Sequence, residues 1–261
     1  MAAQSNEELL RRCWAFFLGI GETIAERVED VGDGLTAVID TRIPLVRDSN
    51  CLVAEREVAA ELIASTSDEV FGELGIKHGH AYARDPAYGA AMSEGLASLG
   101  WEAETDVFQV LRRGPDRPAS PDVEVERASL DEVWEVNRAI MSEDAEGTPE
   151  LIEQIMVRER QTEAAFRDRW FAARHEGEIA SCCRLTQKDG IGQIEDVSTL
   201  KAVRNRGLAR AVSLEAARVS VQDGDEITFI VAYAHEWPRR FYERLGFDPV
   251  GEMTSAQREP G

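Results

Sequence analysis

The feature that most constrains the fold of this chain is an ending that occurs twice. Residues 98–113 read SLGWEAETDVFQVLRR and residues 244–259 read RLGFDPVGEMTSAQRE, with their Leu-Gly-aromatic triplets aligned. Upstream of these segments, HAYARDP at 80–86 is similar to VAYAHEWP at 231–238. Because the paired segments follow in the same order, they predict an internal duplication in which each copy ends in a strand, a helix and a strand.

Composition predicts where the two copies are separated. The segment RRGPDRPASPD, at 112–122, holds three prolines and a glycine between two periodic stretches, which is typical of a linker. We therefore expect two domains, at 1–115 and 122–261. Strand and helix patterns occur in both, which indicates an α+β fold whose mixed, mostly antiparallel sheets are flanked by helices.

Charge and cysteine usage narrow the class of function. The chain carries 49 acidic and 29 basic side chains, a net charge of -20 that disfavours nucleic acid and favours a cationic partner. The four cysteines show neither a disulfide framework nor metal-ligand spacing, and His78 and His80 lack a third ligand nearby, so no metal site is expected. The most apolar run, at 13–21, is too short to span a membrane and lacks the flanks of a signal peptide. These observations predict a cytoplasmic protein.

The second half has clear start and stop signals for its elements. Ser129 and Glu132 form a capping box that opens one helix, and Thr148 with Pro149 opens another that runs through the 160s. The other predicted elements are strands at 123–129, 170–174, 179–187, 192–200 and 227–233, and helices at 208–223 and 238–245. The middle three strands are expected to form an antiparallel meander.

The first half has vaguer signals. Apolar residues at helical spacing predict a helix with one buried face over 6–30. Strands are expected near 35–40, 51–54 and 77–83, and a second helix over 58–74. These elements complete an α+β pattern.

A glycine loop carries the chemistry. The segment VSTLKAVRNRGLARAV, at 197–212, joins a strand to a helix. Successive backbone N–H groups at a helix start can cradle an anion, and Gly207 lets the backbone approach it while Ala209 keeps the next position open. Positive charge collects around the loop, at Arg204, Arg206 and Arg210. The alternative is a basic helix start that binds nothing.

This loop, followed after a buried strand by RRFYERLGF, resembles motifs A and B of the GCN5-related N-acetyltransferases (GNAT). The resemblance covers about 140 residues, from Val123 to the end. It implies acetyl-CoA as acetyl donor, with the pyrophosphate at the loop and the pantetheine beside the preceding strand. It places cofactor contacts at Val197, Ser198, Thr199, Arg204, Asn205, Arg206, Gly207, Leu208, Ala209 and Arg210. His235 stands where many members carry an asparagine that contacts the cofactor, so a further contact is placed there.

Acetyl transfer to an amine needs a base for the ammonium proton, a donor for the thioester oxygen and an acid for the departing thiolate. Tyr242 matches the family's general acid. The family often places its base on the strand before the loop, where Glu195 is our first choice and Asp196 the second. Strand alternation predicts that these two carboxylates point to opposite faces. A backbone N–H of Val197 or Thr199 is expected to stabilise the oxygen.

The first half has no such loop between Asn50 and Ala60. We therefore expect residues 1–115 to form a degenerate GNAT-like half without cofactor binding. The whole chain is predicted to transfer acetyl from acetyl-CoA to a primary amine of a small molecule or peptide by direct attack in a ternary complex. A cationic acceptor agrees with the acidic composition. A non-catalytic acetyl-CoA-binding sensor or regulatory protein, and an interaction scaffold, remain alternatives, and a homodimer is left open.

Overall fold

A computed structural model describes residues 4–143 and 147–259 of the chain. They form two compact units that interleave along the sequence. Unit 1 comprises the residues up to Phe108, Ala232–Glu236 and the residues from Val250, whereas unit 2 comprises Gln109–Val231 and Trp237–Pro249. No single cut therefore separates the units, and the domain limits of 1–115 and 122–261 remain a prediction.

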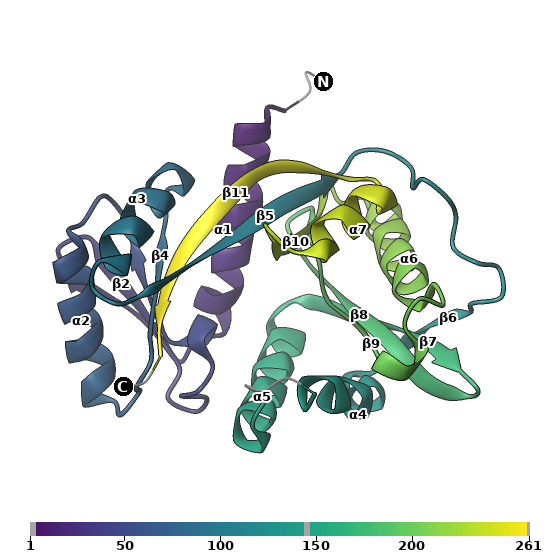
Figure 1. The fold of residues 1–261 in the computed structure, drawn as a ribbon, viewed down its shortest axis with the longest axis horizontal. Helices are drawn as coiled ribbons and strands as arrows, with labels where there is room; N and C mark the ends of the chain where they lie inside the picture. The colour runs from purple at the N-terminus through teal and green to yellow at the C-terminus, as the bar shows by residue number, and fades with distance from the viewer. Residues whose placement is uncertain (1–3, 144–146, 260–261) are drawn as a thin grey trace. The chain divides into compact units, whose positions relative to one another are not determined.

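Unit 1 contains the elements of the first half and the end of the last strand. In chain order these are α1 (Asn6–Ile24), β1 (Arg27–Gly32), β2 (Leu35–Ile39), a 3-10 helix (Arg47–Ser49), β3 (Cys51–Ala54), α2 (Ala60–Glu73), β4 (Gly79–Ala83), α3 (Pro86–Ala97) and β5 (Glu102–Leu111). Its strands follow the order β1-β2-β3-β4-β11-β5, where β11 is Phe247–Arg258. β3 and β4 are parallel, and β11 joins β4 in antiparallel fashion. Helices α2 and α3 lie beside each other along these strands (Figure 1).

The predicted helix over 6–30 is wrong in its last part. α1 begins after an N-cap at Ser5 and ends at Ile24, and residues 27–32 instead form a strand that pairs with β2. The turn between the strands is Gly32-Asp33-Gly34, in which all three residues have positive φ angles. Such a turn directs the chain into a hairpin, and the apolar spacing of the helix stops at Ile24. Residues 27–32 therefore form a strand of this hairpin and do not continue the helix.

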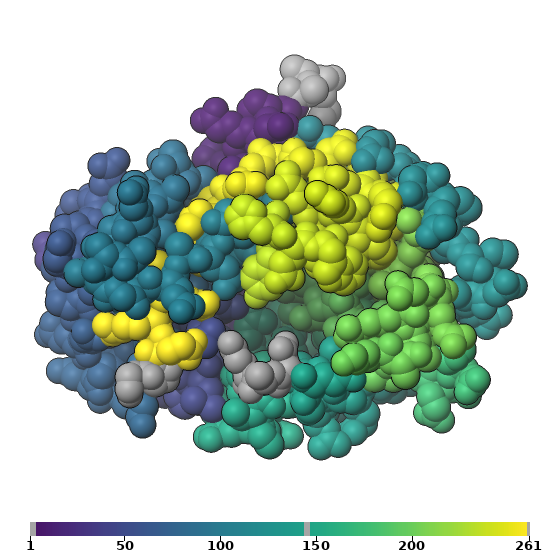
Figure 2. All heavy atoms as spheres, in the orientation of Figure 1, coloured from purple at the N-terminus to yellow at the C-terminus, as the bar shows by residue number. Residues whose placement is uncertain are grey.

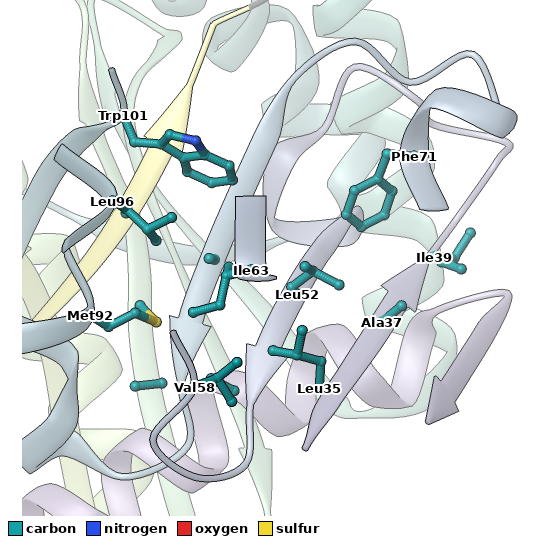
Figure 3. Packing of buried hydrophobic residues seen from close by; sticks show 14 of the residues in the cluster. Leu35, Ala37, Ile39, Leu52, Val58, Ile63, Phe71, Met92, Leu96 and Trp101 are labelled. Carbon is teal, nitrogen blue, oxygen red and sulfur yellow. The ribbon is translucent and has the colours of Figure 1, made fainter. Parts of the chain in front are cut away.

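The core of unit 1 lies between its strands and helices α2 and α3. Figure 3 shows Leu52 from β3 near Ile63 and Phe71 from α2, and Leu96 from α3 near Trp101. All five side chains are at most 3 % exposed. Burial of this size supplies most of the driving force for folding. Unit 1 thus has a hydrophobic core of its own.

Unit 2 follows the predicted pattern closely. Its elements are β6 (Val125–Ala128), α4 (Leu130–Met141), α5 (Pro149–Ala165), β7 (Arg167–His175), β8 (Glu178–Lys188), β9 (Ile191–Thr199), a 3-10 helix (Lys201–Val203), α6 (Leu208–Asp223), β10 (Ile227–Tyr233), α7 (Trp237–Leu245) and the start of β11. The strand order is β10-β9-β8-β7-β6, antiparallel except for β9 with β10. The capping box of Ser129 and Glu132, the Thr148 cap and the antiparallel meander are confirmed. Helices α4 and α5 lie on one side of the meander and α6 on the other (Figure 1).

The duplicated endings have the same element order. The first copy is β4, α3 and β5, and the second is β10, α7 and β11. Gly100 and Gly246, the glycines of the repeated triplets, both have positive φ angles, of 85° and 103°. The predicted pair of strand-helix-strand endings is therefore confirmed. Figure 2 shows the yellow segment that includes α7 at the surface. Within this helix Trp237 is 70 % exposed, whereas Tyr242 is buried.

Candidate active site

The glycine loop forms an uncapped helix start. Gly207 is the N-cap residue of α6 with a φ of 84°, and Asn205 also has a positive φ, of 65°. Among the described residues, no side chain caps this helix, and its first turn holds no acidic residue. A Cβ added at Gly207 meets nothing within 4 Å, so open space faces the backbone there. Backbone N–H groups in this arrangement can bind an anion such as a diphosphate.

The three arginines of the loop have different surroundings. Arg204 is exposed, and its Nε donates to the carbonyl of Thr199 at 3.1 Å. Arg206 is also exposed. Arg210 is buried, and its Nη1 lies 2.8 Å from Asp116 and donates to the carbonyl of Arg117 at 2.9 Å. The positive charge near the helix start therefore comes mainly from Arg204 and Arg206. Arg210 instead holds the segment 112–122 against α6 through Asp116 and Arg117.

Strands β9 and β10 separate just before the loop. Among the described residues, their parallel register covers only Ile191–Ile194 and Ile227–Ile230, although β9 continues to Thr199. β8 still pairs with the end of β9, since Ser181 lies opposite Thr199. The half-buried segment Val197–Thr199 is thus paired on its β8 side. Its other edge can hydrogen-bond an extended chain.

A bulge in β9 brings the two candidate bases to the same side. Arg184 lies opposite Glu195 and Cys182 opposite Ser198, so β9 has an extra residue here, and Asp196 has a φ of 54°. Carboxylate oxygens of Glu195 and Asp196 each lie 3.1 Å from Nη2 of Arg184. The prediction that they point to opposite faces is therefore wrong. A bulge interrupts the alternation on which that prediction depended.

Arg184 is the centre of a buried carboxylate cluster that the sequence did not reveal. Its side chain is fully buried, and it contacts Glu159 of α5 as well as the two acids of β9. Its Nε lies 4.0 Å from Asp168 of β7, and its guanidinium carbon lies 5.5 Å from the ring centroid of Trp170. A buried charge requires such partners. The available signal was an arginine inside the apolar run SCCRL of a predicted strand.

Asp168 is an acid of this cluster with a strongly raised pKa. Burial raises the pKa of Asp168 to about 8, against an ordinary value of 3.8, and the charges of Glu195 and Asp196 raise it further while Thr186 lowers it. Its side chain is 1 % exposed. Strongly perturbed acids beside a cation are typical of functional sites.

Tyr242 lies close to the bulge. It is 8 % exposed on α7, and its ring centroid lies 5.2 Å from that of Phe241. Burial raises the pKa of Tyr242, and the nearby Cys183 and Asp196 raise it further. The phenol therefore keeps its proton at neutral pH. His235 is exposed in the turn after β10 and belongs to unit 1, and its contact remains a prediction.

A cavity of about 290 Å³ lies against α4 and α5, away from the loop. It is lined by Glu135, Arg138, Ala139, Ser142, Pro149, Ile152 and Glu153. None of the predicted site residues lines it. Within the described residues, no group of three or more His, Cys, Asp or Glu side chains is arranged to hold a metal ion. No helix in the same part of the chain has the length and apolarity needed to cross a membrane.

Comparison with known protein families gives a match over part of the chain. Residues 133–247 match the model of the acetyltransferase (GNAT) family. None of the curated proteins matches the chain. The match therefore covers the meander, the glycine loop and α7.

Solved structures share the fold over almost the whole chain. A GCN5-related N-acetyltransferase from Kribbella flavida has a TM-score of 0.68 at 16 % identity, and the alignment covers 99 % of this chain and 97 % of that one. A conserved protein of unknown function from Staphylococcus epidermidis has a TM-score of 0.71 at 11 % identity, with 90 % and 94 % covered. A tandem GNAT protein from the clavulanic acid biosynthesis pathway has a TM-score of 0.58 at 15 % identity, with 87 % and 78 % covered. Residues 133–247 therefore match the acetyltransferase (GNAT) family, and the chain as a whole shares its fold with solved GNAT structures, a tandem GNAT protein among them.

Proposed function

We propose that this protein transfers an acetyl group from acetyl-CoA to a primary amine in a ternary complex. The observation that carries the proposal is the uncapped start of α6 at Gly207, directly after the point where β9 leaves β10. The residues present fit the donor, because open space faces Gly207 and positive charge flanks it. A cytoplasmic location and a cationic acceptor, small molecule or peptide, are part of the same proposal.

The residues proposed to hold acetyl-CoA lie at the start of α6 and at the end of β9. Backbone N–H groups of the first turn of α6, with Arg204 and Arg206, bind the diphosphate. The open edge of Val197–Thr199 receives the extended pantetheine arm, and a backbone N–H of this segment stabilises the thioester oxygen as it gains charge. Acetyl-CoA supplies an activated thioester whose thiolate is a good leaving group. Arg210, being engaged by Asp116, contributes through the position of the helix start.

The residues that handle protons come from β9 and α7. An ammonium group must lose its proton before its nitrogen can attack, and Glu195 of the bulge is the proposed acceptor of that proton. Asp196 is the second candidate and shares the contact with Arg184. Tyr242 keeps its proton at neutral pH and is the proposed donor to the departing thiolate. A carboxylate base and a phenolic acid on neighbouring elements meet the needs of direct acyl transfer.

Replacing Tyr242 by Phe tests the proposal. The variant should bind CoA as tightly as the wild type, judged by thermal stabilisation and calorimetry, while the acetylation rate of an amine panel falls about 10- to 100-fold. Tyr233→Phe is the matched control, because Tyr233 is 49 % exposed and belongs to unit 1. CoA binding without turnover of any amine by the wild type would instead favour a sensor. Absence of CoA binding would favour a scaffold.

A further inference from the structure

Thr186 is hydrogen-bonded to two carboxylates at once. This fully buried residue of β8 places its Oγ1 2.7 Å from Oδ1 of Asp168 and 3.0 Å from Oε1 of Glu195. A hydroxyl has one proton and can donate it to only one acceptor. If both carboxylates were ionised, one of these contacts would join two oxygen atoms with no hydrogen between them. One of the two acids must therefore carry a proton and donate it to Thr186.

The charges around the cluster favour the same conclusion. The ionisable groups that face it are Arg158, Glu159 and Glu163 from α5, Asp168 from β7, Arg184 from β8, and Glu195 and Asp196 from β9. Arg160 of α5 also pairs with Glu163, so five acids face three cations. A buried cluster with this excess of negative charge takes up protons.

The surroundings decide which acid holds the proton. Glu195 lies 3.1 Å from the guanidinium of Arg184 and is 18 % exposed, so a cation and solvent both reach its carboxylate. Asp168 is 1 % exposed and 4.0 Å from the same group. Its Oδ2 is buried, and among the described residues it has no hydrogen-bond partner. An ionised oxygen is costly in such a position.

We propose that Asp168, Thr186 and Glu195 share one proton that resides on Asp168, so that Thr186 donates to an ionised Glu195. Asp168 and Thr186 are then positioning residues, and Glu195 is held ready to take the proton of an attacking amine; this last step rests on the proposed function. In that step the amine N–H bond breaks, the new O–H bond forms on Glu195, and the nitrogen lone pair is free to attack.

Infrared spectroscopy of the free protein tests the shared proton without any turnover. The wild type should show a carboxylic-acid C=O band at neutral pH that disappears as the pH rises through about 8. Burial also raises the pKa of Asp106, to about 7, so the variants are compared in an Asp106→Asn background. There the band should be absent in Asp168→Asn and present in Glu195→Gln. Absence of the band in the wild type, or its loss in Glu195→Gln with retention in Asp168→Asn, would overturn the proposal. In the Asp106→Asn protein, whose Asp168, Thr186 and Glu195 are unchanged, the absence of a band that titrates near pH 8 overturns the proposal even if the other variants fold poorly.

Kinetics test what the proton arrangement does. Asp168→Asn should keep at least half of the neutral-pH kcat, because its amide N–H donates to Thr186 as the protonated acid does. Glu195→Gln, the matching amide substitution, should lose at least 100-fold. Thr186→Val should lower kcat about 10-fold and move the acid limb of the kcat/KM profile to higher pH, and Thr186→Ser should restore both. Equal losses in Asp168→Asn and Glu195→Gln would contradict the inference.

These two tests separate the inference from the proposed function. A wild type that shows the Asp168-dependent band but acetylates no amine retains the shared proton and refutes the enzyme. A wild type that acetylates amines but lacks the band retains the enzyme and refutes the shared proton.

Discussion

Two strand-to-helix junctions occupy corresponding places in the duplicated chain, and they differ in their backbone hydrogen bonding. At the β3–α2 junction of unit 1, the N–H of Val58 is bound by the hydroxyl of Tyr88 at 3.0 Å, and Glu55 is paired with Arg84. At the β9–α6 junction of unit 2, Gly207 begins the helix with no capping side chain among the described residues. α2 also begins without a capping side chain, at Ala59. The junctions therefore differ just before the helix start, where the N–H of Val58 is bound internally, and in the positive charge that flanks Gly207.

The neighbouring strands differ in the same way. β3 stays in register with β4 up to Ala54, its last residue. The N–H of Arg84 then donates a hydrogen bond to the carbonyl of Ala54. β9 leaves the register of β10 after Ile194, five residues before it ends. A sheet that stays closed offers no edge to a ligand. Under the proposed function, a few backbone hydrogen bonds separate the junction that binds acetyl-CoA from the one that does not, while each unit has a buried core.

Each unit also has an aspartate whose pKa is raised by burial, and the largest expected effect is on how stability depends on pH. Burial raises the pKa of Asp168 to about 8 in unit 2 and that of Asp106 to about 7 in unit 1. Because the unfolded chain releases these protons near pH 4, each aspartate lowers stability as the pH rises from about 4 to its folded pKa. In Asp168→Asn, the part of the fall in unfolding free energy that Asp168 causes between about pH 4 and pH 8 should disappear. In Asp106→Asn, the corresponding part between about pH 4 and pH 7 should disappear. At about 1.4 kcal/mol per pKa unit, the change is worth at most about 6 kcal/mol for Asp168 and about 4 kcal/mol for Asp106.

Chemical denaturation at pH 5, 7 and 9 measures both effects. Asp68→Asn serves as the control, since Asp68 is 60 % exposed in its ion pair with Arg258. Identical pH profiles for the wild type and both buried-aspartate variants would show that neither side chain holds a proton in the folded state.

The next effect compares the two ends of α6. Gly207 and Gly224 both have φ angles near 85°, and a Cβ at either meets nothing within 4 Å. Replacement by Ala strains both positions alike, by about 1 kcal/mol. Only Gly207→Ala should weaken CoA binding, by about 30-fold in calorimetry, because the added methyl occupies the anion's place. Equal CoA affinities for the two variants would show that the loop at Gly207 does not contact CoA.

The charge of the loop should have a smaller effect. Arg206→Ala should weaken CoA binding about fivefold and reduce its dependence on salt concentration, because one cation near the diphosphate is lost. Arg218→Ala is the control, since Arg218 lies further along α6 and pairs with Glu215. Titrations at two ionic strengths measure both. A loss that does not change with salt would contradict an electrostatic role.

The smallest effect returns to the junction of unit 1. Tyr88→Phe removes the hydroxyl that binds Val58 and should lower the free energy of unfolding by about 1 kcal/mol. It should not create CoA binding in unit 1, because Glu55 and Glu61 keep that junction acidic. Measuring CoA stoichiometry in this variant tests the claim. A second bound CoA would show that the unit 1 junction needs only a free N–H to bind.

Much of the fold follows from local sequence. Ser129 and Thr148 began helices where their capping side chains predicted, and Gly224 ended α6. The error at 27–32 arose because helical periodicity was extended past Ile24, although a Gly-Asp-Gly turn lay a few residues ahead. Local signals identify where elements begin and end, since caps and turns involve neighbours in the chain.

The candidate site was only partly predictable. Gly207 and Tyr242 could be found from a motif, because their roles depend on a short spacing that the sequence displays. Asp168 and Thr186 could not, since their partners lie on other strands and alternation treats them as ordinary strand residues. The β9 bulge also escaped detection, and it is what turns Asp196 toward Arg184.

The sequence by itself determined the duplicated endings, the glycine loop and the excess of acidic residues. These depend on residue type and spacing, which need no third dimension. Only the tertiary structure decided that four carboxylates gather around Arg184 and that Thr186 lies between two of them. Strand pairing brings together residues that are far apart in the chain, and burial then decides which of them must hold a proton.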